Sequence, residues 1–143
     1  MAEIYAEVSQ FHSRQLQLLD TGLHDDAALR AWADTLAVDA EHWVNSRPAP
    51  TRGREAILAA QHANPIWLEL KRQDLMRRHS ISNLVVEVDP DGTVHSSYYV
   101  HVVDTARGGP VTVGSPTLVR ETLTREDGEL RTLRRKVERD DLR

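Results

Sequence analysis

The sequence predicts an α+β fold in which helices come first and an antiparallel sheet follows. Apolar residues in the first half recur mainly at helical spacing, and from Met76 onward the period of the pattern changes to two. Turn sequences divide the second half into strand patterns that are joined as hairpins. Helices followed by a strand meander favour a helical layer that covers one face of the sheet.

A first helix is expected over residues 3–20, with Gly22 as its end. Asp25 and Asp26 open a second helix, because carboxylates suit the positive end of a helix dipole. The buried face of this second helix is expected to contain Leu29, Trp32, Ala33, Leu36 and Ala37.

A short strand is expected over residues 41–45, followed by a proline-containing turn at 47–50. Thr51 is a candidate cap for a third helix that starts near Gly53. The inward-facing residues of that helix are expected to be Ala56, Ile57 and Ala60. Asn64–Pro65 starts another helix, with asparagine as the cap and proline at the first helical position.

The sheet is expected to contain the strands 76–89, 93–105, 111–125 and 129–138. Asp89–Gly92 is a strong hairpin turn, because proline and glycine stand where turn geometry favours them. Pro116 cannot donate a ladder hydrogen bond, so an edge or a bulge is expected in the third strand. A sheet that curves over helices leaves a deep cavity at its open end, where ligands commonly bind.

Composition indicates one soluble globular domain over residues 1–143. The net charge of −4 gives no basic field that would favour nucleic acid. The absence of cysteine excludes disulfides, thiolate metal sites and a cysteine nucleophile. No membrane-spanning run or signal-peptide pattern is present, so a cytoplasmic protein is expected. No metal-ligand spacing or phosphate loop occurs, and neither a cofactor nor a metal is predicted.

His79 is the leading candidate for acid/base chemistry, because it opens the first long strand and histidine titrates near neutral pH. Strand alternation places His79, Ile81 and Asn83 on one face, and Asn83 is therefore a candidate for substrate binding. The alternative is a hydrogen-bonded surface histidine. Asp20 is either a carboxylate at the pocket mouth that orients a histidine or a water, or the polar end of a helix.

In the second strand Tyr98 is expected to face the pocket and Tyr99 to face away, and a register slip would exchange them. Tyr98 could donate a hydrogen bond to a substrate oxygen or serve as a core residue. Ser115 and Thr117 are expected to line the pocket with small hydroxyls. The tryptophans are expected in the core, and Trp43 is the one assigned to substrate binding. The segment Arg134–Lys136 is interpreted as a solvated strand face, with an anion site as the alternative.

Four sequence segments resemble the nuclear transport factor 2-like superfamily, and within it the SnoaL-like group of polyketide cyclases and scytalone dehydratase. They are Leu18–Gly22, Ala37–Asp39, Arg52–Ile57 and Arg77–His79. The resemblance covers nearly the whole chain and implies a conical α+β barrel, with N-terminal helices packed in a strongly curved, mainly antiparallel sheet. It also implies a deep pocket, and commonly a homodimer packed through the sheet.

The resemblance also suggests roles for individual residues. Asp20 and His79 are similar to the pocket aspartate and the acid/base histidine of the dehydratase branch. Ser115 stands where that branch has a pocket serine, and Thr117 where it has an asparagine. Tyr98, however, stands near the position of a second catalytic histidine. Strands 111–125 and 129–138 also lack the inward aspartate on which the aromatic polyketide cyclases rely.

Two functions of different classes follow. The leading hypothesis is a cofactor-free enzyme of secondary metabolism, such as polyketide or antibiotic biosynthesis, that cyclises, dehydrates or isomerises a hydrophobic polyketide-like or aromatic intermediate. The alternative is a non-catalytic ligand-binding protein or a small structural subunit of a ring-hydroxylating dioxygenase-type complex. Binding of an aromatic ligand without conversion would favour a carrier, and co-purification with a larger iron-containing partner would favour the subunit.

Overall fold

The computed structural model describes residues 1–143, and its helices and strands follow the predicted order. The helices are α1 (Ala2–Gly22), α2 (Asp26–Ala33), α3 (Arg54–His62) and α4 (Pro65–Arg72), with a short 3-10 turn at Asp140–Leu142. The strands are β1 (Leu36–Val44), β2 (Thr51–Arg52), β3 (Met76–Val88), β4 (Val94–Thr105), β5 (Val111–Val113), β6 (Thr117–Glu126) and β7 (Glu129–Arg139).

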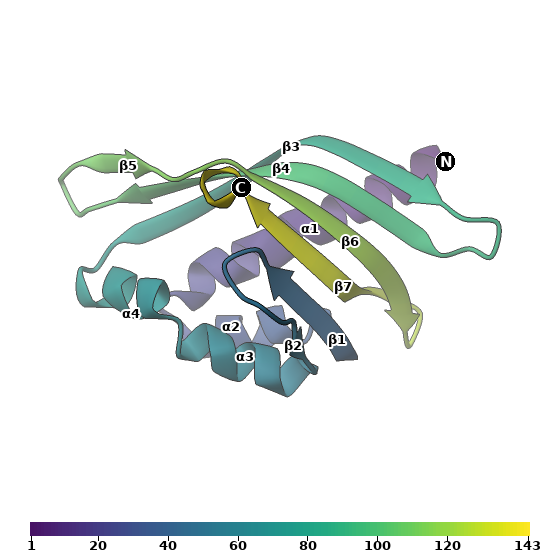
Figure 1. Cartoon of the computed structure of the whole chain (residues 1–143), viewed down its shortest axis with the longest axis horizontal. Helices are drawn as coiled ribbons and strands as arrows, with labels where there is room; N and C mark the ends of the chain where they lie inside the picture. The colour runs from purple at the N-terminus through teal and green to yellow at the C-terminus, as the bar shows by residue number, and fades with distance from the viewer.

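All seven strands belong to one mixed sheet in the order β2-β1-β7-β6-β4-β3, with β5 paired to β4. The meander from β3 through β4 and β6 to β7 is antiparallel, as predicted. β1 pairs with β7 in the parallel direction, which extends the sheet by strands from the first half of the chain. Figure 1 shows the strands arching over α1, with α2, α3 and α4 on the same side. The α+β fold is therefore confirmed.

The main core lies where α1 meets α2 and the inner face of β1. Asp25 caps α2 by accepting hydrogen bonds from the backbone N–H groups of Ala27 and Ala28, at 2.9 and 3.2 Å. The close packing of α1 on α2 requires Gly22, because an added Cβ would lie 2.9 Å from the Cα of Leu29. No helix of the protein combines the length and the apolar character needed to cross a membrane.

The second helix is shorter than predicted, and the strand after it is longer. Leu36 and Ala37 were expected on the helix, but they are the first residues of β1, where both are buried. Burial alone does not separate a helix from a strand in a short apolar run. The predicted cap Thr51 is also wrong, because Thr51 and Arg52 pair with β1. Gly53 stands at the N-cap of α3 instead, with φ +92°.

The predicted third strand is interrupted at Gly114–Pro116, which divides it into β5 and β6. Proline at this break agrees with the expected loss of ladder pairing. The inner faces of β4 and β6 follow the predicted alternation, since Ser96, Tyr98 and Val100 are buried on β4 while Tyr99 is 46% exposed.

The prediction for Asn83 is wrong. Asn83 is exposed, has φ +56° and lies at a register shift between Ser82 and Val85 in the β3–β4 pairing. The extra residue makes a β-bulge, and asparagine tolerates the left-handed conformation better than most residues. After the bulge the inward positions change from odd to even residue numbers, so Leu84 and Val86 continue the inner face started by His79.

Candidate active site

The cone contains a cavity of about 590 Å³ between the inner sheet face and the helices. Apolar atoms make up the larger part of the surface that lines it. The apolar walls include Leu16, Leu19, Trp32, Ile66, Trp67, Val100, Val102, Val119 and Val137. A mainly apolar cavity with a few polar groups is the usual form of a small-molecule site.

His79 lines this cavity and forms a dyad with Asp20. The Nδ1 atom of His79 lies 2.5 Å from Oδ1 of Asp20, and the backbone N–H of His79 donates to Oδ2 of the same carboxylate at 3.0 Å. The side chains are 13% and 6% exposed, respectively. Asp20 therefore fixes both the backbone and the ring of His79. The dyad joins the end of α1 to the sheet.

The dyad geometry sets the tautomer of His79. A carboxylate that accepts from Nδ1 favours the proton on that nitrogen, which leaves the Nε2 lone pair free. Nε2 of His79 makes no hydrogen bond within the protein. The dyad can thus present one proton acceptor to a molecule in the cavity, with the ring held in place from behind.

His42 is a second cavity histidine, and sequence reasoning missed it. It lies on β1, on the face of that strand opposite to Trp43. Burial is the main reason that the pKa of His42 is lowered to about 3, and the positive charges of Arg135 and Arg47 lower it further. The Glu121 carboxylate acts in the opposite direction and raises this pKa. The ring is therefore neutral at pH 7 and offers one N–H and one lone pair. Strand alternation from the buried Ala40 could have placed His42 inside.

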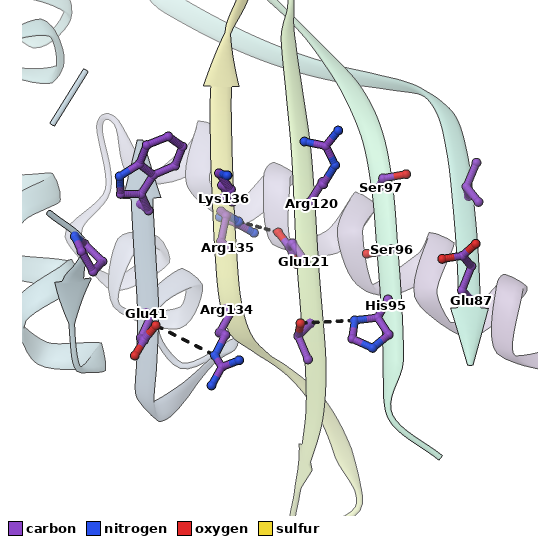
Figure 2. A pocket seen from close by; sticks show the side chains of 14 residues that line it. Glu41, Glu87, His95, Ser96, Ser97, Arg120, Glu121, Arg134, Arg135 and Lys136 are labelled. Atoms are coloured by element: carbon purple, nitrogen blue, oxygen red, sulfur yellow. Dashed lines mark hydrogen bonds and ion pairs between the residues drawn. The ribbon is translucent and has the colours of Figure 1, made fainter. Parts of the chain in front are cut away.

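A buried ion pair lies beneath the cavity, and sequence reasoning missed this too. Glu121 on β6 pairs with Arg135 on β7, and Figure 2 marks this interaction between the two strands. The second carboxylate oxygen accepts from Thr132 Oγ1 at 3.0 Å, and Tyr98 Oη donates to Oε1 at 2.9 Å. Burial raises the pKa of the Tyr98 hydroxyl well above its usual value, so Tyr98 remains a donor to Glu121. Its ring lines the cavity while its hydroxyl proton is engaged.

The same network extends into α1 through Gln15 and His12. The Gln15 side chain accepts from Arg135 and donates to Thr132 Oγ1 at 3.1 Å. His12 is fully buried, with Nε2 2.9 Å from Ser96 Oγ and Nδ1 3.7 Å from Glu121. Burial lowers the pKa of His12 despite the nearby Glu121 carboxylate. The network fixes α1 against the sheet and forms the floor of the cavity.

Ser115 and Thr117 line the cavity near the break between β5 and β6. Their hydroxyls make long hydrogen bonds to backbone carbonyls, at 3.3 Å from Ser115 to Pro116 and at 3.4 Å from Thr117 to Ser115. The Ser115 oxygen also accepts from the backbone N–H of Asp141 at 3.2 Å. The hydroxyl protons, which make only these long bonds, can turn toward a ligand at little cost. Their role in substrate binding stays a prediction.

Trp43 lies outside this cavity. It lines a separate hollow of about 680 Å³ on the outer sheet face, where Lys136 Nζ lies 4.8 Å from the centre of its ring. Figure 2 shows this face, with Arg120, Arg134 and Lys136 on neighbouring strands. Asn83 is absent from both linings. The cavity tryptophans are Trp32 and Trp67 instead. The homodimer predicted through the sheet stays a prediction.

Stability is expected to fall as the pH drops below 6.5, because folding lowers the pKa of both His12 and His42. Their pKa values are lowered from 6.5, so below that pH the unfolded chain binds protons that the folded protein does not. The associated stability is fully present above pH 6.5 and is lost as the pH decreases. Each histidine contributes up to about 1.4 kcal/mol per pH unit.

Urea unfolding at several pH values between 6.5 and 5 measures this slope. Glu121 also has a lowered pKa, but its effect develops mainly below 4.5, the ordinary pKa of glutamate, so the histidines dominate this window. His42→Gln is expected to reduce the pH dependence of the free energy of unfolding by the contribution of one histidine. An identical slope in the wild type and His42→Gln would contradict the assignment of a neutral, desolvated His42.

Comparisons with known proteins agree with this fold. The sequence profile described as a SnoaL-like domain matches residues 1–136. Aln2 from a Streptomyces species is 37% identical, with 99% of this chain and 94% of that chain covered and a TM-score of 0.85. A Catenulispora acidiphila protein in complex with S-DNPA is 34% identical, with 99% and 96% covered and a TM-score of 0.82. ActVI-ORFA from Streptomyces coelicolor is 25% identical, with 98% and 97% covered and a TM-score of 0.82. No protein with a curated description matches the chain.

Proposed function

The chain belongs to the SnoaL-like domain family, and on that premise we propose that it is a cofactor-free acid/base enzyme acting on a polyketide-like or aromatic intermediate. The observation that carries the proposal is the Asp20–His79 dyad at the wall of a mainly apolar cavity. Membership of the family supports an enzyme-like role, and the reaction follows from the chemistry of the dyad.

Cyclisation, dehydration and isomerisation of a polyketide share one step, the removal of a proton from carbon next to a carbonyl group. In this proposal Nε2 of His79 takes that proton. The electron pair of the C–H bond forms a C=C bond, and the π pair of the carbonyl group moves to its oxygen, which gives an enolate. Asp20 holds the ring and stabilises the imidazolium that forms. The same imidazolium returns the proton to the product carbon in an isomerisation and to the departing hydroxyl group in a dehydration. In a cyclisation the enolate carbon attacks a second carbonyl group, and the imidazolium protonates the alkoxide that this forms.

The developing enolate oxygen needs hydrogen-bond donors. His42 supplies an N–H from β1, and the hydroxyls of Ser115 and Thr117 supply two more from the break before β6. The apolar walls surround the hydrocarbon part of the substrate and exclude water from the enolate. Tyr98 contributes its ring, since its hydroxyl donates to Glu121.

Hydrogen–deuterium exchange tests this proposal without knowledge of the natural substrate. The protein is incubated in D2O with 2-acetylnaphthalene, whose methyl protons lie next to a carbonyl, and NMR follows the loss of the methyl signal. Exchange is expected to exceed that with the same concentration of free imidazole by about a hundredfold. S-DNPA, the compound bound by the Catenulispora relative, is expected to inhibit this exchange.

The assay also addresses the non-catalytic alternative. Tryptophan fluorescence reports ligand entry, because Trp32 and Trp67 line the cavity. Saturable quenching by S-DNPA and by 2-acetylnaphthalene, with exchange no faster than with imidazole, would favour a ligand-binding protein over an enzyme.

A further inference from the structure

The cavity lining has an unbalanced set of charged residues. Four arginines and two histidines contribute to it, while no aspartate or glutamate does. This contrasts with the whole chain, whose net charge is −4. The arginines are Arg47, Arg77, Arg135 and Arg139. Whether the cavity attracts an anion depends on how many of them are already neutralised by carboxylates behind the lining.

Three of these arginines have a carboxylate partner. Arg77 donates from Nε and Nη2 to Asp104, both at 2.8 Å. Arg139 donates to Asp141 at 3.1 and 2.7 Å. The third, Arg135, forms the buried ion pair with Glu121. In each pair the carboxylate accepts from the guanidinium and also cancels its charge. These three side chains are part of the wall rather than free cations.

Arg47 is different, because no carboxylate lies within 4.0 Å of its guanidinium. Its one hydrogen bond runs from Nη1 to Thr51 Oγ1 at 3.4 Å. At least four of its five donors are therefore free. Arg47 is part of the cavity lining, and its charge contributes to the lowered pKa of His42 in the same lining.

The backbone around Arg47 supports a fixed position at the rim. Its N–H donates to the carbonyl of Val44 at 2.9 Å, which closes a turn after β1. The next residues, Pro48 and Pro50, restrict the loop. The N-terminus of α4, at Asn64–Ile66, also contributes to the cavity lining.

We propose that the substrate of this cavity carries a carboxylate, and that Arg47 binds this group at the rim. This deepens the proposed function and rests on it: the carboxylate is held at one end, and the aromatic body extends inward between Trp67 and Tyr98 toward His79. One unpaired guanidinium matches the single charge and the two oxygens of a carboxylate. A free acid is thus favoured over a neutral ester or a dianionic phosphate.

The test compares 2-naphthoate with methyl 2-naphthoate, which differ in this charge. Binding is measured by tryptophan fluorescence at pH 8, where arginine is charged and neutral histidine is favoured. Wild-type protein is expected to bind the acid about tenfold more tightly than the ester. Arg47→Gln is expected to bring the two affinities within about twofold by weakening the acid alone. Added salt should reduce the preference of the wild type.

Arg14→Gln is the matched control, because Arg14 is exposed on α1 and does not line the cavity. It is expected to retain the full preference for the acid. Thermal melts check that Arg47→Gln folds, as expected for a change in an exposed loop. Arg47→Lys is expected to recover part of the preference, since lysine keeps the charge but not the bidentate geometry.

Equal binding of acid and ester by the wild type would overturn the carboxylate subsite and leave the proposed enzyme intact. A preference that persists in Arg47→Gln would also overturn it, because another group would then select the acid. Failure of both ligands to bind would overturn the subsite together with the aromatic substrate class on which it rests.

Discussion

Replacing His79 by glutamine is expected to reduce turnover by about a hundredfold to ten thousandfold. Glutamine can keep a hydrogen bond to Asp20 and fill much of the same volume, but it cannot accept a proton at neutral pH. The dyad is largely buried, with side chains 13% and 6% exposed, so bulk water is a poor substitute for the lost base. The exchange of 2-acetylnaphthalene protons measures the effect, with fluorescence binding as the test of an intact cavity.

Asp20→Asn is expected to lower turnover as well, with little change in ligand affinity. Asp20 is a positioning residue that acts through His79. It contacts the imidazole and the backbone N–H of His79, and it does not itself line the cavity. The amide removes the charge that stabilises the imidazolium. A shift in the ¹⁵N NMR tautomer signature of His79 would separate this effect from general destabilisation.

The control for both variants is His62→Gln. His62 is an exposed histidine at the end of α3 and lies outside the cavity lining, so turnover should not change. Survival of turnover within a few-fold in His79→Gln and in His79→Ala would remove the acid/base role from the dyad.

Replacing Arg135 by methionine is expected to destabilise the protein by about 3–5 kcal/mol. Arg135 and Glu121 are 8% and 3% exposed, and the substitution leaves the Glu121 carboxylate buried without its cation. Tyr98 and Thr132 continue to donate hydrogen bonds to this carboxylate, but neutral donors do not cancel its charge. Urea unfolding at pH 7 measures the loss of free energy.

The double variant Glu121→Leu with Arg135→Met is expected to recover most of this loss, because it removes both charges at similar volume. Arg120→Met is the matched control on the outer face of β6. Arg120 is 55% exposed, and its pair with Glu138 should contribute no more than about 1 kcal/mol. A loss in Arg135→Met no larger than in Arg120→Met would contradict the structural role of the buried pair.

Much of the fold could be predicted because local chemistry specifies it. Asn64 does cap α4, accepting from the N–H of Ile66 at 2.9 Å, and Pro65 is the first helical residue. The turn after β3 and the alternation of β4 were also correct, including the inward Tyr98. Capping, proline geometry and strand period act over a few residues, so they can be identified without knowing what packs nearby.

The dyad was only half determined by sequence. The histidine near the start of β3 could equally be a hydrogen-bonded surface residue, and the aspartate could simply be the polar end of α1. The two residues are separated by 59 positions, and only the packing of α1 under β3 brings their atoms to 2.5 Å. The resemblance to the dehydratase branch suggested that both residues belong to the pocket, but it left open whether Asp20 orients the histidine or holds a water.

By itself, then, the sequence determined the helix starts, the turns and the order of the meander. The tertiary structure alone decided the inward register of β3 after its bulge and the burial of the Glu121–Arg135 pair. A bulge at Asn83 changed the inward register of β3, and Arg135, interpreted as part of a solvated face, became buried against Glu121. Alternation identifies two strand faces, but a charged residue can occupy the inner one wherever a neighbouring strand supplies its counter-charge. The counter-charge for Arg135 is Glu121 on another strand, so the burial of Arg135 depends on the pairing of β6 with β7 and not on the local sequence.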